Sequence, residues 1–203
     1  MNSPISIIII SSDNNYILSE TLPLLLSQEY DEPYEVIVAR ETRQGEIKDI
    51  VETLLDKHKN LKSTYLPDKP IYATNEQIET LLAVKASAHS RILVVSPSYM
   101  PQSAEWLQNV SKRLDNIIQE TSNAYTVVLG EQHYSKRRWI YKVRHRLRTK
   151  KLIRKKNSNC DTFIKGIRPD KETRNLFTIM FDKNEYINDS ALRQVIDYHL
   201  RTS

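Results

Sequence analysis

Residues 5–10 read ISIIII, and this run of β-branched side chains decides the fold class of the chain. Six apolar residues are too few to cross a bilayer, and they show neither the basic flank nor the cleavage site of a signal peptide, so we expect a buried strand. Related runs follow at 34–39 (YEVIVA), 91–95 (RILVV) and 125–129 (YTVVL), with a weaker one at 61–66. Continuous apolar runs of this length are typical of parallel strands that are covered on both faces.

Amphipathic stretches separate these runs. Apolar residues recur at helical spacing after Asp13, after Gly45, from 75 to 87 and after Ser103. Strands that alternate with helices predict an α/β fold, in which a mostly parallel sheet carries helices on both faces.

The last third of the chain has a different character. A polar stretch at 157–171 precedes a predicted strand at 175–181 and a closing helix at 189–200. We expect this part to pack on the sheet, so that residues 1–203 form a single domain.

The composition excludes several classes of protein. The 203 residues include one cysteine, Cys160, which allows no internal disulfide and no cysteine-based zinc site and suits a reducing, cytoplasmic compartment. Gly45, Gly130 and Gly166 are too scattered to form a G-x-G-x-x-G or Walker loop, which excludes dinucleotide enzymes and P-loop ATPases. The five histidines are dispersed, and no serine is flanked by glycines as in a nucleophile elbow.

The positive charge is concentrated in residues 136–156. This segment, KRRWIYKVRHRLRTKKLIRKK, holds twelve Lys and Arg and no acid, whereas the rest of the chain has 18 basic and 25 acidic residues. The protein is therefore an acidic domain with one strongly cationic segment, which indicates a polyanionic partner or an anionic membrane surface.

Six short motifs follow one another along the chain: ISIIIISSDNN (5–15), Gln28-Glu29-Tyr30, YEVIV (34–38), ILVVSPSYMPQSAEWL (92–107), Thr173-Arg174-Asn175-Leu176-Phe177 and Asp182-Lys183. In their order and spacing they resemble the family 2 glycosyltransferases, which have the Rossmann-like GT-A fold. The resemblance extends along nearly the whole chain. It implies a nucleotide-sugar-binding half in residues 1–130 and, in residues 131–203, the basic segment and a shortened acceptor side that includes Arg174 and Asn175.

The resemblance also implies a chemistry. Members bind a nucleotide sugar, such as a UDP-sugar, at the carboxyl ends of the strands, where open α/β sheets hold their ligands. An Asp-x-Asp motif holds Mg or Mn against the diphosphate, and a carboxylate base deprotonates the acceptor hydroxyl. The residues at the nucleotide-sugar-binding positions are Asp13, Arg40, Glu41, Ser96 and Ser98.

The chain departs from the family pattern at these positions. Ser96 and Ser98 replace the metal-binding aspartates, and neutral hydroxyls are poor ligands for a hard cation, so we expect no metal or other cofactor. Arg40 and Glu41 replace an Asp-Asp pair. Asp189 is the nearest carboxylate to the expected base position and is a weak candidate for it.

Two hypotheses follow for the pocket. We favour a degenerate relative, a pseudoenzyme that has kept the scaffold and lost catalysis, over an active metal-independent transferase in which Arg40 pairs with phosphate. Arg40 could equally be a surface or salt-bridged arginine at a strand end, and Ser96 and Ser98 simple turn residues beside Pro97 and Pro101.

The basic segment has three open interpretations. Its helical periodicity predicts a cationic amphipathic element that suits an anionic membrane, and we expect a peripheral protein of bacterial type at the inner membrane face, beside an active glycosyltransferase. The second interpretation is a solvated helix or a contact with another protein. Nucleic-acid binding is the least favoured, because no nucleic-acid-binding motif accompanies the segment. The expected contact residues are Arg137, Arg138, Trp139, Lys142, Arg144 and Arg148.

Overall fold

The computed structural model describes residues 3–11, 15–40, 46–66, 75–95, 101, 103–121, 127–128, 178–190 and 193. Short strands and helices alternate as far as residue 128, and a strand and a short helix follow. The elements are β1 (Ile5–Ser11), α1 (Asn15–Leu26), β2 (Tyr34–Arg40), α2 (Glu46–Leu55), β3 (Leu61–Tyr65), α3 (Asn75–Ala86), β4 (Arg91–Val95), α4 (Trp106–Thr121), β5 (Val127–Val128), β6 (Thr178–Asp182) and α6 (Lys183–Asn188).

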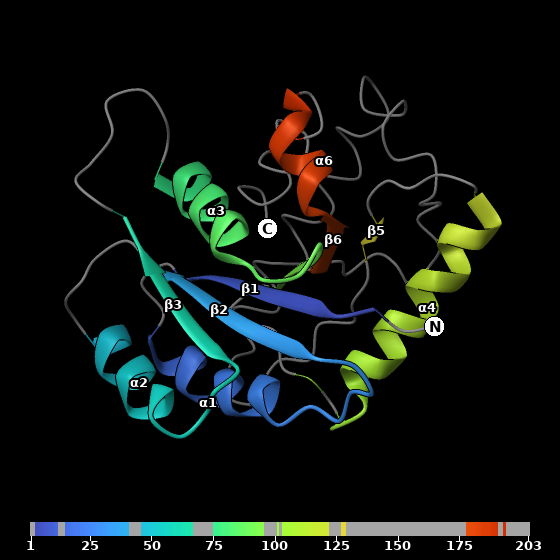
Figure 1. The fold of residues 1–203 in the computed structure, drawn as a ribbon. Coiled ribbons are helices and arrows are strands. Elements are labelled where there is room, and N and C mark those ends of the chain that lie inside the picture. Colours follow the sequence, from blue (N-terminus) through green and yellow to red (C-terminus); the bar gives the residue numbers. More distant parts are fainter. Residues whose placement is uncertain are drawn as a thin grey trace, which may run out of the picture.

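One sheet of six strands, in the order β3-β2-β1-β4-β6-β5, forms the centre of the molecule (Figure 1). β1 pairs in parallel with β2 and β4, and β2 pairs in parallel with β3. β6 is antiparallel to both β4 and β5. The structure therefore confirms the predicted α/β fold with a mostly parallel sheet.

Two apolar cores cover the two faces of the sheet. Helices α1 and α2 lie on one face, and α3 and α6 lie on the other (Figure 1). Side chains alternate along each strand, so that Ile7 and Ile9 face one core and Ile8 the other. The first core packs against α1, α2 and the start of α4, and the second packs against α3 and α6. Burial on both faces explains why the strands of this sheet read as nearly continuous apolar runs.

The C-terminal strand β6 inserts between β4 and β5. Its register pairs Asp182 with Arg91 and Thr178 with Val95, so β6 ends beside the beginning of β4. Residues 178–181 of the predicted strand at 175–181 lie in β6, whereas 175–177 lie outside the described residues, and the pairing of β6 could not be deduced from a local pattern.

The expected helix at 189–200 is only partly tested. A helix that the sequence reading missed, α6, ends before Asp189. The Asp182 carboxylate caps its start, with Oδ1 accepting from the N–H groups of Asn184 (2.8 Å) and Glu185 (3.2 Å). The backbone N–H of Arg193 donates to the Asp189 carbonyl at helical spacing, and the remainder of 189–200 lies outside the described residues.

Candidate functional site at the carboxyl edge of the sheet

The parallel strands end together at one edge of the sheet, where Ser11, Arg40, Tyr65 and Val95 are the last residues of β1, β2, β3 and β4. The register sets Arg40 between Ser11 and Tyr65. The connections run from β1 toward β3 on one side and return to β4 on the other side of β1. Such a reversal of strand order is the point at which open α/β sheets bind ligands, outside the carboxyl ends of the strands.

Among the described residues at this edge, Arg40 is both charged and buried. Its relative exposure is 9%, and neither Nε nor Nη1 has a hydrogen-bond partner among the residues that the structure describes. By alternation with Val36 and Val38, its side chain lies on the α1 and α2 face of the sheet. The interpretation of Arg40 as a surface or salt-bridged arginine is therefore wrong within the described part of the chain.

The neighbouring strand adds two more polar groups of the same kind. The hydroxyl oxygens of Ser63 and Thr64 on β3 are buried and have no hydrogen-bond partner within the described ranges. The register pairs Ser63 with Val38, so Ser63 and Arg40 lie on the same face. Buried polar groups are nearly always hydrogen-bonded, and exceptions call for a water, an ion or a ligand.

Gln28 and Glu29 hold the beginning of α4 and the residues just before it, Ser103 and Ala104, against the end of α1. Its Oε1 accepts from the Leu107 N–H (3.0 Å), and its Nε2 donates to the carbonyls of Leu24 (2.8 Å) and Ser103 (3.2 Å). The Glu29 N–H donates to the Ala104 carbonyl (2.8 Å). The motif Gln28-Glu29-Tyr30 thus joins the end of α1 to the start of α4, a structural role that its spacing did not reveal.

Most of the predicted site residues lie outside the described residues: Asp13, Glu41, Ser96, Ser98, Arg174, Asn175 and the basic-segment residues Arg137, Arg138, Trp139, Lys142, Arg144 and Arg148. Their roles stay predictions. Of the predicted site, the structure describes Arg40 and Asp189.

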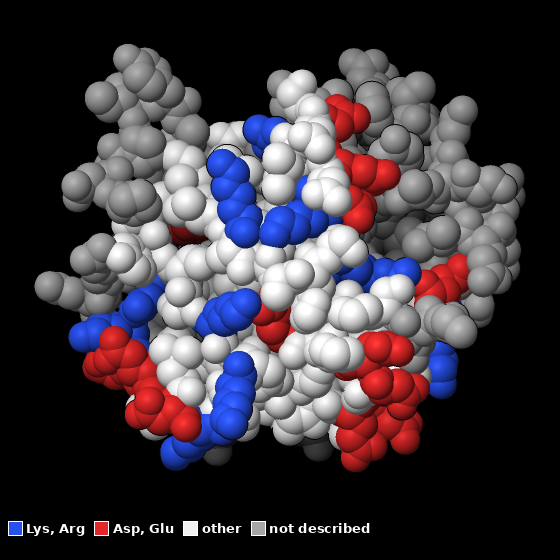
Figure 2. Space-filling view, viewed as in Figure 1, with Lys and Arg blue, Asp and Glu red and all other residues white. Residues whose placement is uncertain are grey.

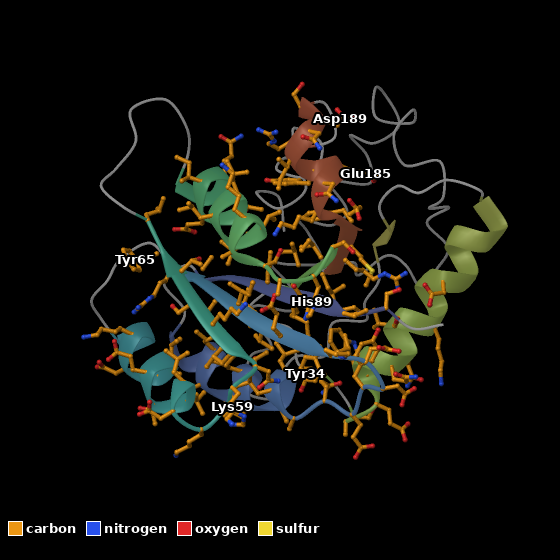
Figure 3. All side chains as sticks on the ribbon, in the orientation of Figure 1. Tyr34, Lys59, Tyr65, His89, Glu185 and Asp189 are labelled. Atoms are coloured by element: carbon orange, nitrogen blue, oxygen red, sulfur yellow. The ribbon has the colours of Figure 1, made fainter. Side chains whose placement is uncertain are left out.

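Asp189 does not lie near Arg40. β6 runs toward the amino edge of the parallel strands before α6 begins, and Asp189 forms the C-terminal end of α6. Figure 3 shows Asp189 at the tip of α6, far from Tyr65, which is the register neighbour of Arg40. The structure therefore does not bring together the two described candidates.

Acidic side chains gather over α6 (Figure 2), where Asp182 and Asp189 cap the two ends of the helix and Glu185 lies in its first turn. Burial raises the pKa of Glu185, and the charges of Asp182 and Asp189 raise it further. One carboxylate oxygen of Glu185, Oε2, is buried without a hydrogen-bond partner in the described part of the chain. Across the described ranges, no three His, Cys, Asp or Glu side chains are grouped so that they could hold a metal ion.

A second charged cluster lies at the opposite, amino edge of the sheet. The Glu35 carboxylate accepts hydrogen bonds of 2.6 Å from Ser6 Oγ and the Ala88 N–H, and it pairs with Lys62 Nζ at 2.6 Å. Burial pushes the pKa of Glu35 upward, but the hydrogen bonds from Lys62, Ser6 and Ala88 outweigh it, so the pKa is lowered. With its carboxylate fully engaged, Glu35 ties the α3–β4 connection to the sheet.

The sheet order, with the antiparallel strand β6 beside β4, fits the GT-A fold, and the family model that matches the chain makes it a glycosyltransferase domain. The chain belongs to glycosyl transferase family 21, whose family model matches residues 4–135. The resemblance to family 2 therefore indicated the correct fold and class, but the family is 21. A comparison with curated proteins gives no match.

Solved structures share this architecture at low sequence identity. Apo xyloside xylosyltransferase 1 from mouse is similar over 99% of this chain and 73% of its own, with a TM-score of 0.51 and 10% identity. Two further matches are residues 1–349 of S. aureus TarS (TM-score 0.45, 20% identity) and the Pyrobaculum calidifontis mannosyltransferase PcManGT in complex with GDP-Man and Mn²⁺ (TM-score 0.48, 13% identity). They cover 66% and 74% of this chain, which spans only 38% and 41% of theirs.

None of the helices in the described part of the chain has the length and apolar character needed to span a bilayer.

Proposed function

We propose that this chain binds a nucleotide sugar at the carboxyl edge of the sheet, that its catalytic power is impaired, and that it acts as an accessory partner of an active glycosyltransferase at the inner membrane face. Membership of a glycosyltransferase family and the reversal of strand order beside β1 support the donor site. The observation that carries the proposal is the buried guanidinium of Arg40 at the end of β2.

This guanidinium disfavours a divalent cation nearby. Like charges repel more strongly where burial lowers the effective dielectric constant, so a cation bound beside Arg40 would be destabilised. The sequence supports the same conclusion, because Ser96 and Ser98 offer hydroxyls where Mg or Mn would need carboxylate oxygens. The residues present do not suit the family's metal, and we assign no step to one.

The acceptor side supports impaired catalysis. Asp189, the candidate base, lies at the end of a helix that begins at the amino edge of the parallel strands. A general base must come within hydrogen-bond reach of the hydroxyl that it deprotonates, and a ligand at the carboxyl edge would be remote from this carboxylate.

An active, metal-independent transferase is the second candidate. In that case Arg40 would stabilise the negative charge that develops on the leaving nucleoside diphosphate, as a preorganised cation can. A third candidate, nucleic-acid binding through residues 136–156, rests on the charge of that segment alone.

Thermal unfolding with donors, combined with a turnover assay, tests the proposal. We expect UDP, UDP-GlcNAc or GDP-mannose to stabilise the chain without metal, by about 2.7 kcal/mol at a ligand concentration of 100 Kd. Release of free nucleoside diphosphate from the bound donor should stay at the level of a buffer control. Stabilisation only with Mn²⁺, together with donor turnover, would contradict the impaired, metal-free site, and turnover without metal would favour the second candidate.

A further inference from the structure

We infer that the Arg40 guanidinium is the anion-binding group of the carboxyl edge and takes a phosphate group of a nucleoside diphosphate in the absence of a divalent cation. The inference rests on the proposed function, because it names the part of the donor that this site holds.

The Arg40 guanidinium lacks a counter-charge among the residues that the structure describes. Arg40 is more than nine-tenths buried, and two of its guanidinium nitrogens have no hydrogen-bond partner among the described residues. In the same part of the chain, ion pairs form at Lys48, Lys62 and Arg91, and none of them includes Arg40. A buried cation without a counter-charge is strongly unfavourable, so an anion that reaches it gains a large part of its binding energy from relieving that cost.

The sheet holds the backbone of Arg40 in place on both sides. Arg40 is paired on both sides, with Ser11 of β1 and Tyr65 of β3, and its carbonyl accepts from the Leu66 N–H (3.2 Å). Its backbone is therefore held by the sheet before any ligand arrives. A planar guanidinium on a fixed backbone matches two oxygens of a phosphate at once, which an ammonium cannot do.

Arg40 also lies at the edge of the sheet where a phosphorylated ligand is expected. Arg40 ends its strand at the edge where doubly wound sheets bind phosphorylated ligands. The Ser63 hydroxyl lies on the same face and also has no partner in the described ranges, so it offers a second hydrogen-bond donor to an anion. A tetrahedral oxyanion can accept hydrogen bonds from both groups, whereas a neutral nucleoside brings no counter-charge to Arg40.

Calorimetric titrations in EDTA test the inference with UDP, pyrophosphate and uridine as probes. We expect UDP and pyrophosphate to bind the unaltered chain and uridine to bind much more weakly. Arg40→Met should weaken UDP and pyrophosphate about 30-fold or more, as expected for a truncated partner of a buried charged hydrogen bond. Lys48→Met, which removes an exposed positive charge from α2 in an i,i+4 ion pair, should change both affinities less than about twofold.

Thermal unfolding without ligand separates this role from a structural one. Because Arg40→Met removes a buried charge whose Nε and Nη1 have no partner among the described residues, the variant should unfold at the same or a higher temperature than the unaltered chain. A lower melting temperature with undiminished UDP affinity would identify Arg40 as structural and overturn the inference.

The titrations also separate the inference from the proposed function. If UDP binds the unaltered chain and Arg40→Met equally well, or uridine binds as tightly as UDP, the inference fails and the donor site stands. If pyrophosphate binds through Arg40 and UDP does not bind, the anion site stands and the nucleotide-sugar proposal fails. Absence of binding by all three probes overturns both.

Discussion

The side-chain oxygen of Gln28 accepts a hydrogen bond of 3.0 Å from the backbone N–H of Leu107, 79 positions further along the chain. The bond links the end of α1 to the beginning of α4. Leu107 lies one residue inside α4, where backbone N–H groups have no partner within the helix, so Gln28 supplies a cap from a distant segment. The same side chain donates to the Ser103 carbonyl (3.2 Å), which fixes the end of the segment that follows β4.

Gln28→Ala should therefore destabilise the fold. The variant loses three hydrogen bonds of a buried side chain, at about 1 kcal/mol each, so we expect the free energy of unfolding to fall by about 2–3 kcal/mol in urea titrations. Gln108→Ala is the matched control, because Gln108 joins the same two segments through exposed hydrogen bonds with Asp31 and should cost less than about 1 kcal/mol. Equal losses in the two variants would contradict the assigned role of Gln28.

Glu35 should make stability depend on pH in the acid range. Its pKa is lower in the folded chain than the ordinary value of 4.5, so the folded state binds fewer protons than the unfolded state. This contribution is complete above pH 4.5 and is lost as the pH falls through the lowered folded pKa. In urea titrations, the free energy of unfolding should fall between pH 7 and pH 3, and Glu35→Gln should reduce this fall. Glu52→Gln is the control, because Glu52 lies on the exposed side of α2 and its removal should leave the fall unchanged. Unchanged acid sensitivity in Glu35→Gln would rule out this linkage.

Glu185 should have the opposite effect. Burial and the charges of Asp182 and Asp189 raise its pKa, so its ionised form is less favourable in the folded chain than in the unfolded chain. The resulting loss of stability is absent below pH 4.5, sets in as the pH rises above that value and is complete above the raised folded pKa. Glu185→Gln should therefore unfold at a higher temperature than the unaltered chain at pH 7, with the difference vanishing near pH 4. Destabilisation at pH 7 would show that the carboxylate has a stabilising partner.

The basic segment predicts binding to anionic membranes. Replacing Arg137, Arg138, Arg144 and Arg148 with Gln removes charges that contribute about 1 kcal/mol each near an anionic surface, so flotation with phosphatidylserine vesicles should fall sharply. Neutral vesicles should recover little of either protein. Equal recovery with both kinds of vesicle would remove the membrane proposal. Salt-dependent binding to single-stranded RNA without lipid preference would favour nucleic acid instead.

The order of strands and helices along the chain could be predicted because each signal is local. The run at 5–10 and the run at 91–95 became β1 and β4, since parallel strands covered on both faces need continuous apolar sequence. The position of β6 between β4 and β5 could not be predicted, because pairing between strands distant in sequence leaves no local pattern.

The short helix α6 was missed although its signal was present. Asp182 is followed three residues later by Glu185, a spacing typical of a helix start, and the structure uses Asp182 as the N-cap. The sequence predicted that Arg40 lies at a strand end. It did not predict that Arg40 is buried, because burial depends on how the surrounding elements pack. The hydrogen bonds of Gln28 to the start of α4 could not be predicted for the same reason, because its partners lie up to 79 positions away in the sequence.

A UDP titration by calorimetry, once in EDTA and once in Mn²⁺, tests the central claim most directly. We expect UDP to bind in EDTA with a dissociation constant that Mn²⁺ changes by less than about threefold, well under 1.4 kcal/mol. UDP binding that appears only when Mn²⁺ is present would contradict this claim.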